Sequence, residues 1–421
     1  MVLAAAVLTV GAALASLTVS RTDLHRDQQL ALKPAPAATP LAPRPPSPTA
    51  DPSAPQSSPE STVPAIAAPT VSQHSRAGTP SFEAAGARAA ASTAPSLSRT
   101  FVGPLHTSGN RIYDATGRPI LLSGINRYGL QSDDTSNLTA DDIGHAKQWG
   151  ANFIRLALGE QLWLATSCKY DPAYASKVDS AVSWITGHGM VALLDLHYNT
   201  LVPCGPAGLH TMADAPNSIN FWEQVAARYK SNPLVAFDLY NEPNNIPDSV
   251  WLDGGQVTEG GVVYNAAGMQ QMYDAIRGQG ASNLVFASGQ RWGQLFPPQL
   301  SGYNIVYAVH AYTCPTEPPP NCGSYGASDP YDPPSAVSDW LTPSQYVPVV
   351  LTEFGWPGTD DGRYIGNMIN YAQSHGWGWA VFFWNGHTGS QWDLTTDVGP
   401  GAAYNPTPSG MPVFSALHGS N

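Results

Sequence analysis

The sequence is poor in charged residues, and above all in basic ones. Charged side chains make up 12% of the 421 residues, and 19 Lys and Arg stand against 31 Asp and Glu, for a formal net charge of −12. A surface that follows a phosphate backbone needs clustered Lys and Arg, and no such cluster occurs here. We therefore expect no nucleic-acid partner. The hydrophobic content of 43% is ample for a packed core.

Cysteine is also scarce, and its spacing excludes one common use. The chain has Cys168, Cys204, Cys314 and Cys322, and none of them forms a CxxC pair, which argues against a zinc ribbon. Four cysteines suit an exported protein and allow three pairings. We favour Cys168–Cys204 and Cys314–Cys322, because each pair would staple loops on one face of the domain. Four free thiols are the alternative.

Large apolar side chains are nearly missing between Lys33 and Ser98, where Pro, Ala, Ser and Thr dominate. Such a segment cannot bury enough surface to offset its ordering entropy, so we expect a disordered linker over residues 28–99. Residues 1–27 hold an apolar run that fits either a signal peptide or a membrane anchor. The protein is then secreted or tethered to the cell surface. Residues 100–421 are expected to form one domain, active as a monomer.

Eight short apolar runs alternate with amphipathic stretches across residues 100–421. Near-continuous apolar strands indicate a sheet that is buried on both faces, and repeated strand–helix alternation predicts an α/β fold, a closed (β/α)8 TIM barrel. A β-hairpin over Leu105–Pro119 precedes it. An open doubly wound sheet would carry a Gly-rich phosphate loop after its first strand, and residues 124–129 lack that spacing. The predicted strands are Ile120–Asn126, Asn152–Leu158, Val191–His197, Val235–Asn241, Asn283–Gly289, Asn304–Tyr312, Val347–Phe354 and Gly378–Trp384.

Helices are predicted between these strands by their amphipathic spacing. They cover Thr139–Trp149, Pro172–Gly187, Ser218–Lys230, Tyr264–Gly278, Pro334–Leu341, Gly362–His375 and a short segment near Met411–His418.

Polar side chains gather where the predicted strands end, which is where barrels of this kind build their chemistry. Two carboxylates from the fourth and seventh strands would face each other across the mouth, where one can donate a proton while the other attacks. Arg155 and Tyr312 can donate hydrogen bonds that keep a neighbouring carboxylate ionised. The residues at the strand ends are Asn126, Arg155, His197, Asn241, Glu242, His310, Tyr312, Glu353 and Trp384.

This pattern closely resembles the family-five glycoside hydrolases, the cellulase-like members of a large retaining clan. The family places an Arg, a His, an Asn-Glu pair, a His-x-Tyr, a Glu and a Trp at successive strand ends. They occur here in that order as Ile154-Arg155-Leu156, Leu196-His197, Asn241-Glu242-Pro243, His310-Ala311-Tyr312, Thr352-Glu353-Phe354-Gly355 and Phe383-Trp384. The resemblance runs from about Leu105 to the C terminus.

The resemblance implies a role for each of these residues. Glu353 would attack the anomeric carbon, and Glu242 would donate a proton to the glycosidic oxygen and then activate water. Asn241 would bind the sugar 2-hydroxyl and Trp384 would stack beneath the sugar. Supporting roles fall to Arg155 and Tyr312, which would orient Glu353, and to His197 and His310, which would shape the site.

Several further expectations concern substrate and cofactor. Trp292 and Trp356 follow strand ends and are predicted to contact substrate, together with Asn126. No metal or other cofactor is expected, because the paired His of metal-dependent barrel hydrolases is missing from Ile120–Asn126. The favoured function is an endo-β-1,4-glucanase acting on β-glucan. A β-mannanase, a β-1,3-glucanase, a glycolipid glycosidase and a non-catalytic glycan-binding barrel remain alternatives.

Overall fold

The computed structural model describes residues 97–419, apart from 134–137, 203, 313–332, 356–361 and 385–391. The predicted leader over residues 1–27, the linker over 28–99, Cys314, Cys322 and Trp356 all lie outside the described residues. Among the residues that are described, no helix has both the length and the apolar character that crossing a membrane requires.

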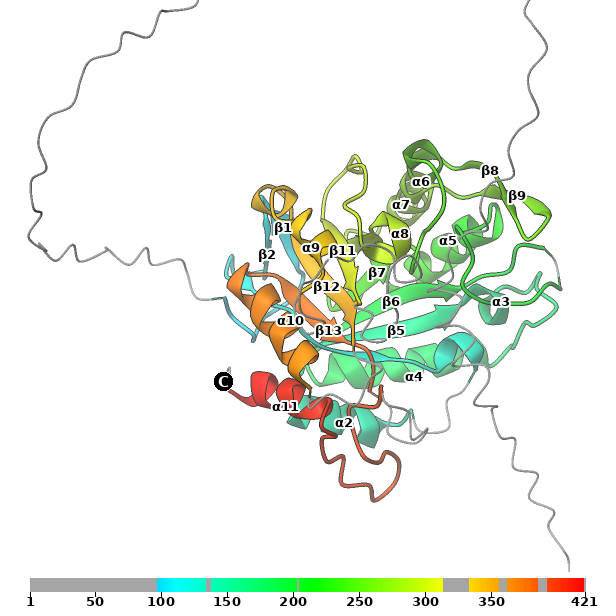
Figure 1. The fold of residues 1–421 in the computed structure, drawn as a ribbon. Coiled ribbons are helices and arrows are strands. Elements are labelled where there is room, and N and C mark those ends of the chain that lie inside the picture. The colour runs from blue at the N-terminus through cyan, green and yellow to red at the C-terminus, as the bar shows by residue number, and fades with distance from the viewer. Residues whose placement is uncertain are drawn as a thin grey trace, which may run out of the picture. The chain divides into compact units, whose positions relative to one another are not determined.

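Eight parallel strands close into a barrel, as the sequence predicted (Figure 1). Their order around the barrel is β10-β11-β12-β13-β4-β5-β6-β7. Each run of apolar residues therefore contributes one stave, and each pairs in parallel with its neighbours. The staves are β4 (Ser123–Arg127), β5 (Phe153–Gly159), β6 (Val191–Tyr198), β7 (Val235–Asp238), β10 (Val285–Ser288), β11 (Ile305–Ala311), β12 (Val349–Phe354) and β13 (Gly378–Val381).

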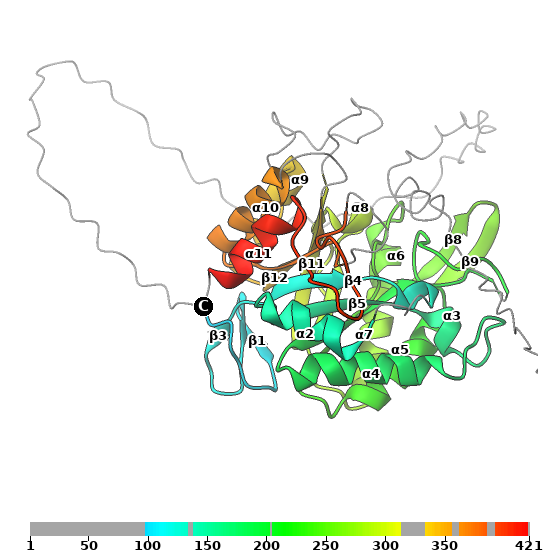
Figure 2. The same cartoon turned by 90° about the horizontal axis from the view of Figure 1, so that it is seen from below.

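Helices surround the barrel on its outside (Figures 1 and 2). The longer ones are α2 (Ala140–Gln148), α4 (Tyr174–Gly187), α5 (Asn217–Tyr229), α7 (Met269–Gly278), α10 (Arg363–Ser374) and α11 (Gly410–His418). Short helices fill the connections: α3 (Glu160–Trp163), α6 (Asp248–Asp253), α8 (Gln290–Gly293), α9 (Ser335–Ser338), η1 (Leu130–Ser132) and η2 (Pro343–Gln345). Most of the long helices begin and end within two residues of the predicted limits.

The predicted N-terminal hairpin is present, as strands β1 (His106–Ser108) and β2 (Arg111–Tyr113). A third strand, β3 (Pro119–Ile120), extends it into a small sheet. The first predicted barrel strand is thus divided between β3 and β4. Leu105, Ile112 and Ile120 share a buried cluster with residues of the barrel interior, so this sheet closes the N-terminal end of the barrel.

A second hairpin, formed by β8 (Gly255–Glu259) and β9 (Val262–Ala266), corrects one prediction. The expected helix Tyr264–Gly278 begins only at Met269, because its first residues belong to β9. Gly260 and Gly261 form the turn of this hairpin, and both have a positive φ, at 55° and 85°. A two-residue turn of this kind matches the twist of the paired strands. The hairpin projects at the margin of the molecule away from β1 and β2 (Figures 1 and 2).

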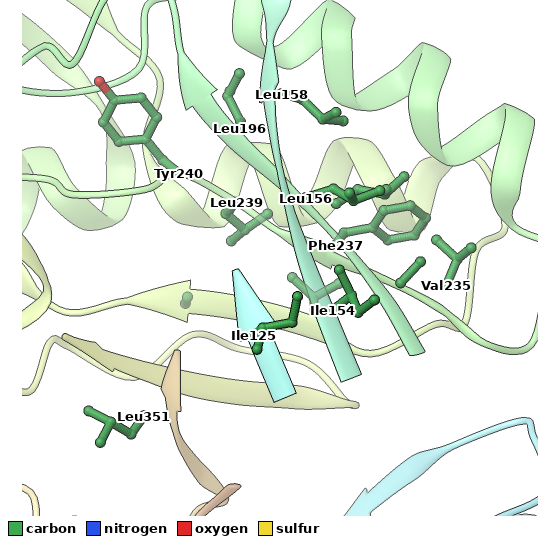
Figure 3. Packing of buried hydrophobic residues seen from close by; sticks show 14 of the residues in the cluster. Ile125, Ile154, Leu156, Leu158, Leu196, Val235, Phe237, Leu239, Tyr240 and Leu351 are labelled. Carbon is green, nitrogen blue, oxygen red and sulfur yellow. The ribbon is translucent and has the colours of Figure 1, made fainter. Parts of the chain in front are cut away.

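Alternation along the strands decides which side chains reach the site. Ile154, Leu156 and Leu158 of β5 pack outward in the layer between strands and helices (Figure 3). The intervening residues of β5 point into the barrel, where Phe153 joins the interior cluster. Arg155 is the next inward position, one step nearer the C-terminal end. Strand β5 therefore contributes apolar side chains to the core and also directs its one basic side chain, Arg155, toward the mouth.

Candidate active site

The predicted polar residues do meet at the C-terminal mouth of the barrel, and nearly all of them are buried. Glu242 and Glu353 are each 5% exposed, and the interior side chains around them are less accessible still. Burial in a low-dielectric surrounding strengthens every hydrogen bond and charge interaction among them. The buried polar members are Asn126, Arg155, His197, Asn241, Glu242, His310 and Glu353.

Glu353, in β12, has both carboxylate oxygens occupied by donors. Arg155 donates from Nη1 to Oε2 at 2.9 Å, and the Tyr312 hydroxyl donates to Oε1 at 2.5 Å. Burial raises the pKa of Tyr312 well above its ordinary range, so the hydroxyl keeps the proton that it donates. These donors occupy both carboxylate oxygens of Glu353 as acceptors and fix the orientation of its side chain.

Glu242 has a different environment. It follows β7, and its Oε1 lies 2.9 Å from Nδ1 of His310. Burial raises the pKa of Glu242 to about 8, even though the charge of Arg155 opposes the shift. Burial also lowers the pKa of His310 to about 4. At neutral pH the pair therefore consists of a protonated carboxyl group and a neutral imidazole.

The two carboxyl groups are close together. One carboxylate oxygen of Glu242 and one of Glu353 lie within 4.8 Å of each other and of a ring nitrogen of His310. A β-bulge between Val309 and His310 places His310 opposite Glu353 in the register of β11 and β12. These three side chains are the group in the described part of the chain whose spacing could suit a metal ion. Oε1 of Glu242, Nδ1 of His310 and both carboxylate oxygens of Glu353 take part in the hydrogen bonds just described, whereas Nε2 of His310 has no hydrogen-bond partner among the described residues.

Arg155 connects Glu353 to the other polar side chains at the mouth. Its Nη2 donates to Oδ1 of Asn241 at 2.7 Å, and its Nε donates to Oδ2 of Asp238 at 2.9 Å. Nη2 also lies 3.0 Å from Oδ1 of Asp195. The amide nitrogen of Asn241 is buried and has no hydrogen-bond partner among the described residues, so one donor at the mouth is left for a ligand.

Asp195 and Asp238 also lie at the site, although the sequence analysis did not name them. Oδ2 of Asp195, in β6, forms a hydrogen bond with Nδ1 of His197 at 2.6 Å. Burial raises the pKa of Asp195 to about 7 and that of Asp238 to about 6, with Arg155 opposing both shifts. The signal that could have found them is their phase, since each lies an even number of residues from an inward-facing neighbour.

Asn126 has a different task from the one predicted. Its amide nitrogen donates to the backbone carbonyls of Thr352 and Ala380 at 2.9 and 3.2 Å. Its oxygen accepts from Nη1 of Arg155 at 3.1 Å. The polar atoms of Asn126 are used inside the barrel. Asn126 therefore helps to position Arg155 by accepting its hydrogen bond, instead of contacting substrate.

Trp384 does not form the predicted sugar platform. Its side chain is 0% exposed, and its Nε1 donates to Asp142 in α2 at 2.9 Å. The ring stacks on Tyr404 and meets the edge of Trp149. Because β13 ends at Val381, the alternation of that strand no longer fixes the direction of Trp384, which packs into the core.

Other aromatic rings lie close to the polar residues of the mouth. Phe382 follows β13 directly, and its ring centroid lies 5.7 Å from Tyr128 and 5.9 Å from Trp392. Trp392 in turn lies 5.6 Å from Tyr312, the hydrogen-bond partner of Glu353. We call Tyr128, Phe382, Trp392 and Tyr312 the aromatic rim. The sequence analysis missed Tyr128 and Phe382 as site residues.

Trp292 lies beside the Glu242 segment, and its predicted contact with substrate stays a prediction. Its backbone nitrogen donates to the carbonyl of Pro243 at 3.1 Å. The residue has a positive φ of 58°, which is uncommon for an aromatic residue and departs from helical geometry within α8. Trp251 and Trp163 are buried in the core instead.

The predicted Cys168–Cys204 disulfide is present, with the two Cα atoms 5.0 Å apart. It joins the loop after α3 to the loop after β6. The latter loop is also held by the β8–β9 hairpin, since Glu259 accepts from the Thr211 backbone and pairs with His210 at 2.9 Å. One side of the mouth is thereby built from three connected insertions.

Comparisons with known proteins identify the family of this chain. A sequence model of the family described as Cellulase (glycosyl hydrolase family 5) matches residues 113–388. A mannan endo-1,4-beta-mannosidase from Salipaludibacillus agaradhaerens is 22% identical over 301 residues, covering 68% of this chain and 83% of the relative. An endoglucanase from Paenibacillus polymyxa is 24% identical over 343 residues, covering 70% of this chain and 83% of the relative.

Solved structures show the same fold. The beta-glucanase from Saccharophagus degradans in complex with cellotetraose is similar with a TM-score of 0.58 at 19% identity, covering 78% of this chain and 98% of that chain. The family match spans well over half of the sequence and includes both mouth carboxylates. The chain belongs to glycoside hydrolase family 5.

Proposed function

We propose that this family-5 glycoside hydrolase is a retaining endo-β-1,4-glucanase, with Glu353 as nucleophile and Glu242 as acid/base. The observation that carries the proposal is the pair of carboxylate oxygens within 4.8 Å of each other. Double displacement needs carboxyl groups about 5–5.5 Å apart, whereas an inverting enzyme needs about 6.5–9.5 Å to admit a water molecule. The spacing supports direct attack on the sugar.

The environments of the two carboxyl groups support different roles. Glu242, with its pKa raised to about 8 by burial, holds a proton that the leaving glycosidic oxygen can take. Glu353 is held as an acceptor by Arg155 and Tyr312, and it attacks the anomeric carbon to give a glycosyl-enzyme intermediate. Glu242, now ionised, then takes a proton from water as the water oxygen bonds to the anomeric carbon. The bond between that carbon and Glu353 breaks, so the sugar leaves and both carboxyl groups return to their starting states.

Substrate binding is assigned to the remaining polar and aromatic groups at the mouth. The unpaired amide nitrogen of Asn241 is placed to donate to a sugar hydroxyl beside Glu353. The aromatic rim offers ring faces to the apolar C–H face of a pyranose. Trp292 is a further proposed contact, from the segment next to Glu242.

The sugar and linkage are the finer part of the proposal. An endoglucanase and a mannan endo-1,4-beta-mannosidase are both among the relatives, so β-mannan is the second candidate. Kinetics on carboxymethyl cellulose, mixed-linkage β-glucan, laminarin and galactomannan, with Glu353→Ala as control, test the choice. The proposal predicts the highest kcat/KM on a β-1,4-glucan. Equal rates for wild type and Glu353→Ala on all substrates would instead support a glycan-binding barrel.

We further propose that residues 100–421 are the catalytic domain of an exported monomer. Residues 28–99 would be a linker, and residues 1–27 a signal peptide or anchor that tethers the enzyme to the cell surface. The Cys168–Cys204 disulfide supports an oxidising compartment. N-terminal sequencing of the mature protein, with fractionation of cells and medium, distinguishes cleavage from anchoring, and light scattering gives the oligomeric state.

A further inference from the structure

Arg155 carries one positive charge but contacts three carboxylates. Nε lies 2.9 Å from Asp238, Nη2 lies 3.0 Å from Asp195, and Nη1 lies 2.9 Å from Glu353. The side chains of Arg155, Asp195 and Asp238 are at most 1% exposed. A cation that balanced all three anions equally would give Glu353 only a fraction of its support.

The contacts fix the guanidinium in three directions. Asp195 and Asp238 occupy paired positions on β6 and β7, so they hold it from two adjacent staves. The same Nη2 that approaches Asp195 also donates to Asn241, and Nη1 is directed at Glu353. Because the guanidinium is planar and rigid, fixing Nε and Nη2 also sets where Nη1 points.

We propose that Asp195 and Asp238 are positioning residues that orient Arg155 toward Glu353 and Asn241 and leave its charge to Glu353. Asp238 acts by accepting a hydrogen bond from Nε, and Asp195 acts through its close contact with Nη2. The inference rests on the proposed roles of Glu353 and Asn241. Neither aspartate touches the reacting atoms. Each acts through Arg155, and so controls both the nucleophile and the amide that meets the sugar.

Protonation of Asp195 and Asp238 would remove their negative charges, so that the positive charge of Arg155 is left to Glu353. Burial raises the pKa of Asp195 to about 7 and of Asp238 to about 6, so in mildly acidic solution each holds a proton much of the time. A protonated carboxyl group still accepts an N–H through its carbonyl oxygen. The other titratable groups facing Glu353 are His310 and Tyr312 from β11 and Glu242 after β7.

Substitution of Asp238 separates orientation from charge. Asp238→Ala removes the acceptor, so Arg155 can turn away from Glu353. We expect kcat/KM to fall by about 10²-fold, the cost typical of a misplaced catalytic group, mainly through kcat. Asp238→Asn keeps an acceptor of the same shape and resembles the protonated carboxyl group. We expect it to stay within about threefold of wild type in mildly acidic buffer.

The pH profile distinguishes positioning from a general loss of structure. If Arg155 turns away in Asp238→Ala, ionised Glu353 loses a cation, and the acidic limb of kcat/KM moves to higher pH. Asp142→Ala is the matched control, because Asp142 is a fully buried carboxylate that pairs with Arg127 at 2.8 Å outside the barrel. It should lose stability and leave the acidic limb in place.

Two results would overturn the proposal. One is a loss of activity in Asp238→Asn as deep as that expected for Asp238→Ala, which would show that charge and not orientation matters. The other is an unmoved acidic limb in folded Asp238→Ala. If Asp238→Ala does not fold, Asp238→Asn in mildly acidic buffer decides alone. Wild-type hydrolysis with an inactive Glu353→Ala establishes the proposed function separately, so a failure of either idea is recognisable.

Discussion

Removing a single oxygen atom from Tyr312 probes how the nucleophile is held. Tyr312→Phe deletes the hydroxyl that donates to Glu353 at 2.5 Å and leaves the ring that packs near Trp392. The ionised form of Glu353 loses one of its two donors, while Arg155 remains. We therefore expect the acidic limb of kcat/KM to move to higher pH, because the negative charge needed at the nucleophile loses a hydrogen-bond donor.

The size of the shift follows from the strength of the lost contact. A hydrogen bond to a charged group contributes about 1.5–3 kcal/mol, and one pKa unit corresponds to about 1.36 kcal/mol. The acidic limb should therefore move up by about 1–2 pH units. The free energy of unfolding at neutral pH should fall by a similar amount, because the folded state loses the same contact while the ring and its packing are kept.

Initial rates on a soluble β-glucan across the acidic pH range measure the shift. Tyr364→Phe is the matched control, since its buried hydroxyl donates to the backbone carbonyl of Ala311 at 2.9 Å and not to a carboxylate. That variant should lose about 1 kcal/mol of stability with an unchanged acidic limb. An unmoved limb in Tyr312→Phe, or equal shifts in both variants, would refute the account of Glu353.

Three further predictions concern other parts of the molecule. Glu242→Gln should lower kcat by about 10²–10⁴-fold on a glucan, and much less in the first step of an activated aryl glycoside, as stopped-flow kinetics would show. Because the folded-state pKa of Glu242 is raised to about 8, wild type should lose stability as pH rises toward that value, and Glu242→Gln, which stays neutral, should lose less in thermal unfolding. Trp392→Ala should raise KM by about tenfold through loss of about 1.5 kcal/mol of ring contact, with circular dichroism confirming the fold. Replacing Cys168 and Cys204 together by Ser should cost about 2–5 kcal/mol in denaturant unfolding, and no change would indicate that the disulfide does not constrain the chain.

The staves of the barrel could be predicted from the sequence because burial on both faces leaves a direct trace in it. Runs such as Val191–Tyr198 and Val349–Phe354 are almost wholly buried, and strand ends then locate the mouth. Glu242, Glu353, Arg155, His310 and Tyr312 were found in this way, and the structure brings them together. Local pattern was sufficient wherever regular alternation continued to the residue in question.

Prediction failed where alternation stopped or where distant strands had to combine. Trp384 lies beyond the end of β13, so its direction depends on packing against Tyr404 and Asp142. The β8–β9 hairpin was overlooked because the apolar spacing around Tyr264 also fits a helix. The shared contact of Asp195 and Asp238 with Arg155 depends on closure of the barrel, which no single stretch of sequence reveals.

The anomeric form of the first product most directly tests whether Glu242 and Glu353 act on one glycosidic bond by double displacement. Proton NMR during hydrolysis of a soluble β-1,4-glucan records that form before mutarotation. Attack by Glu353 followed by attack of water predicts that the β-anomer appears first. Initial accumulation of the α-anomer would mean a single displacement, and Glu353 could not be the nucleophile.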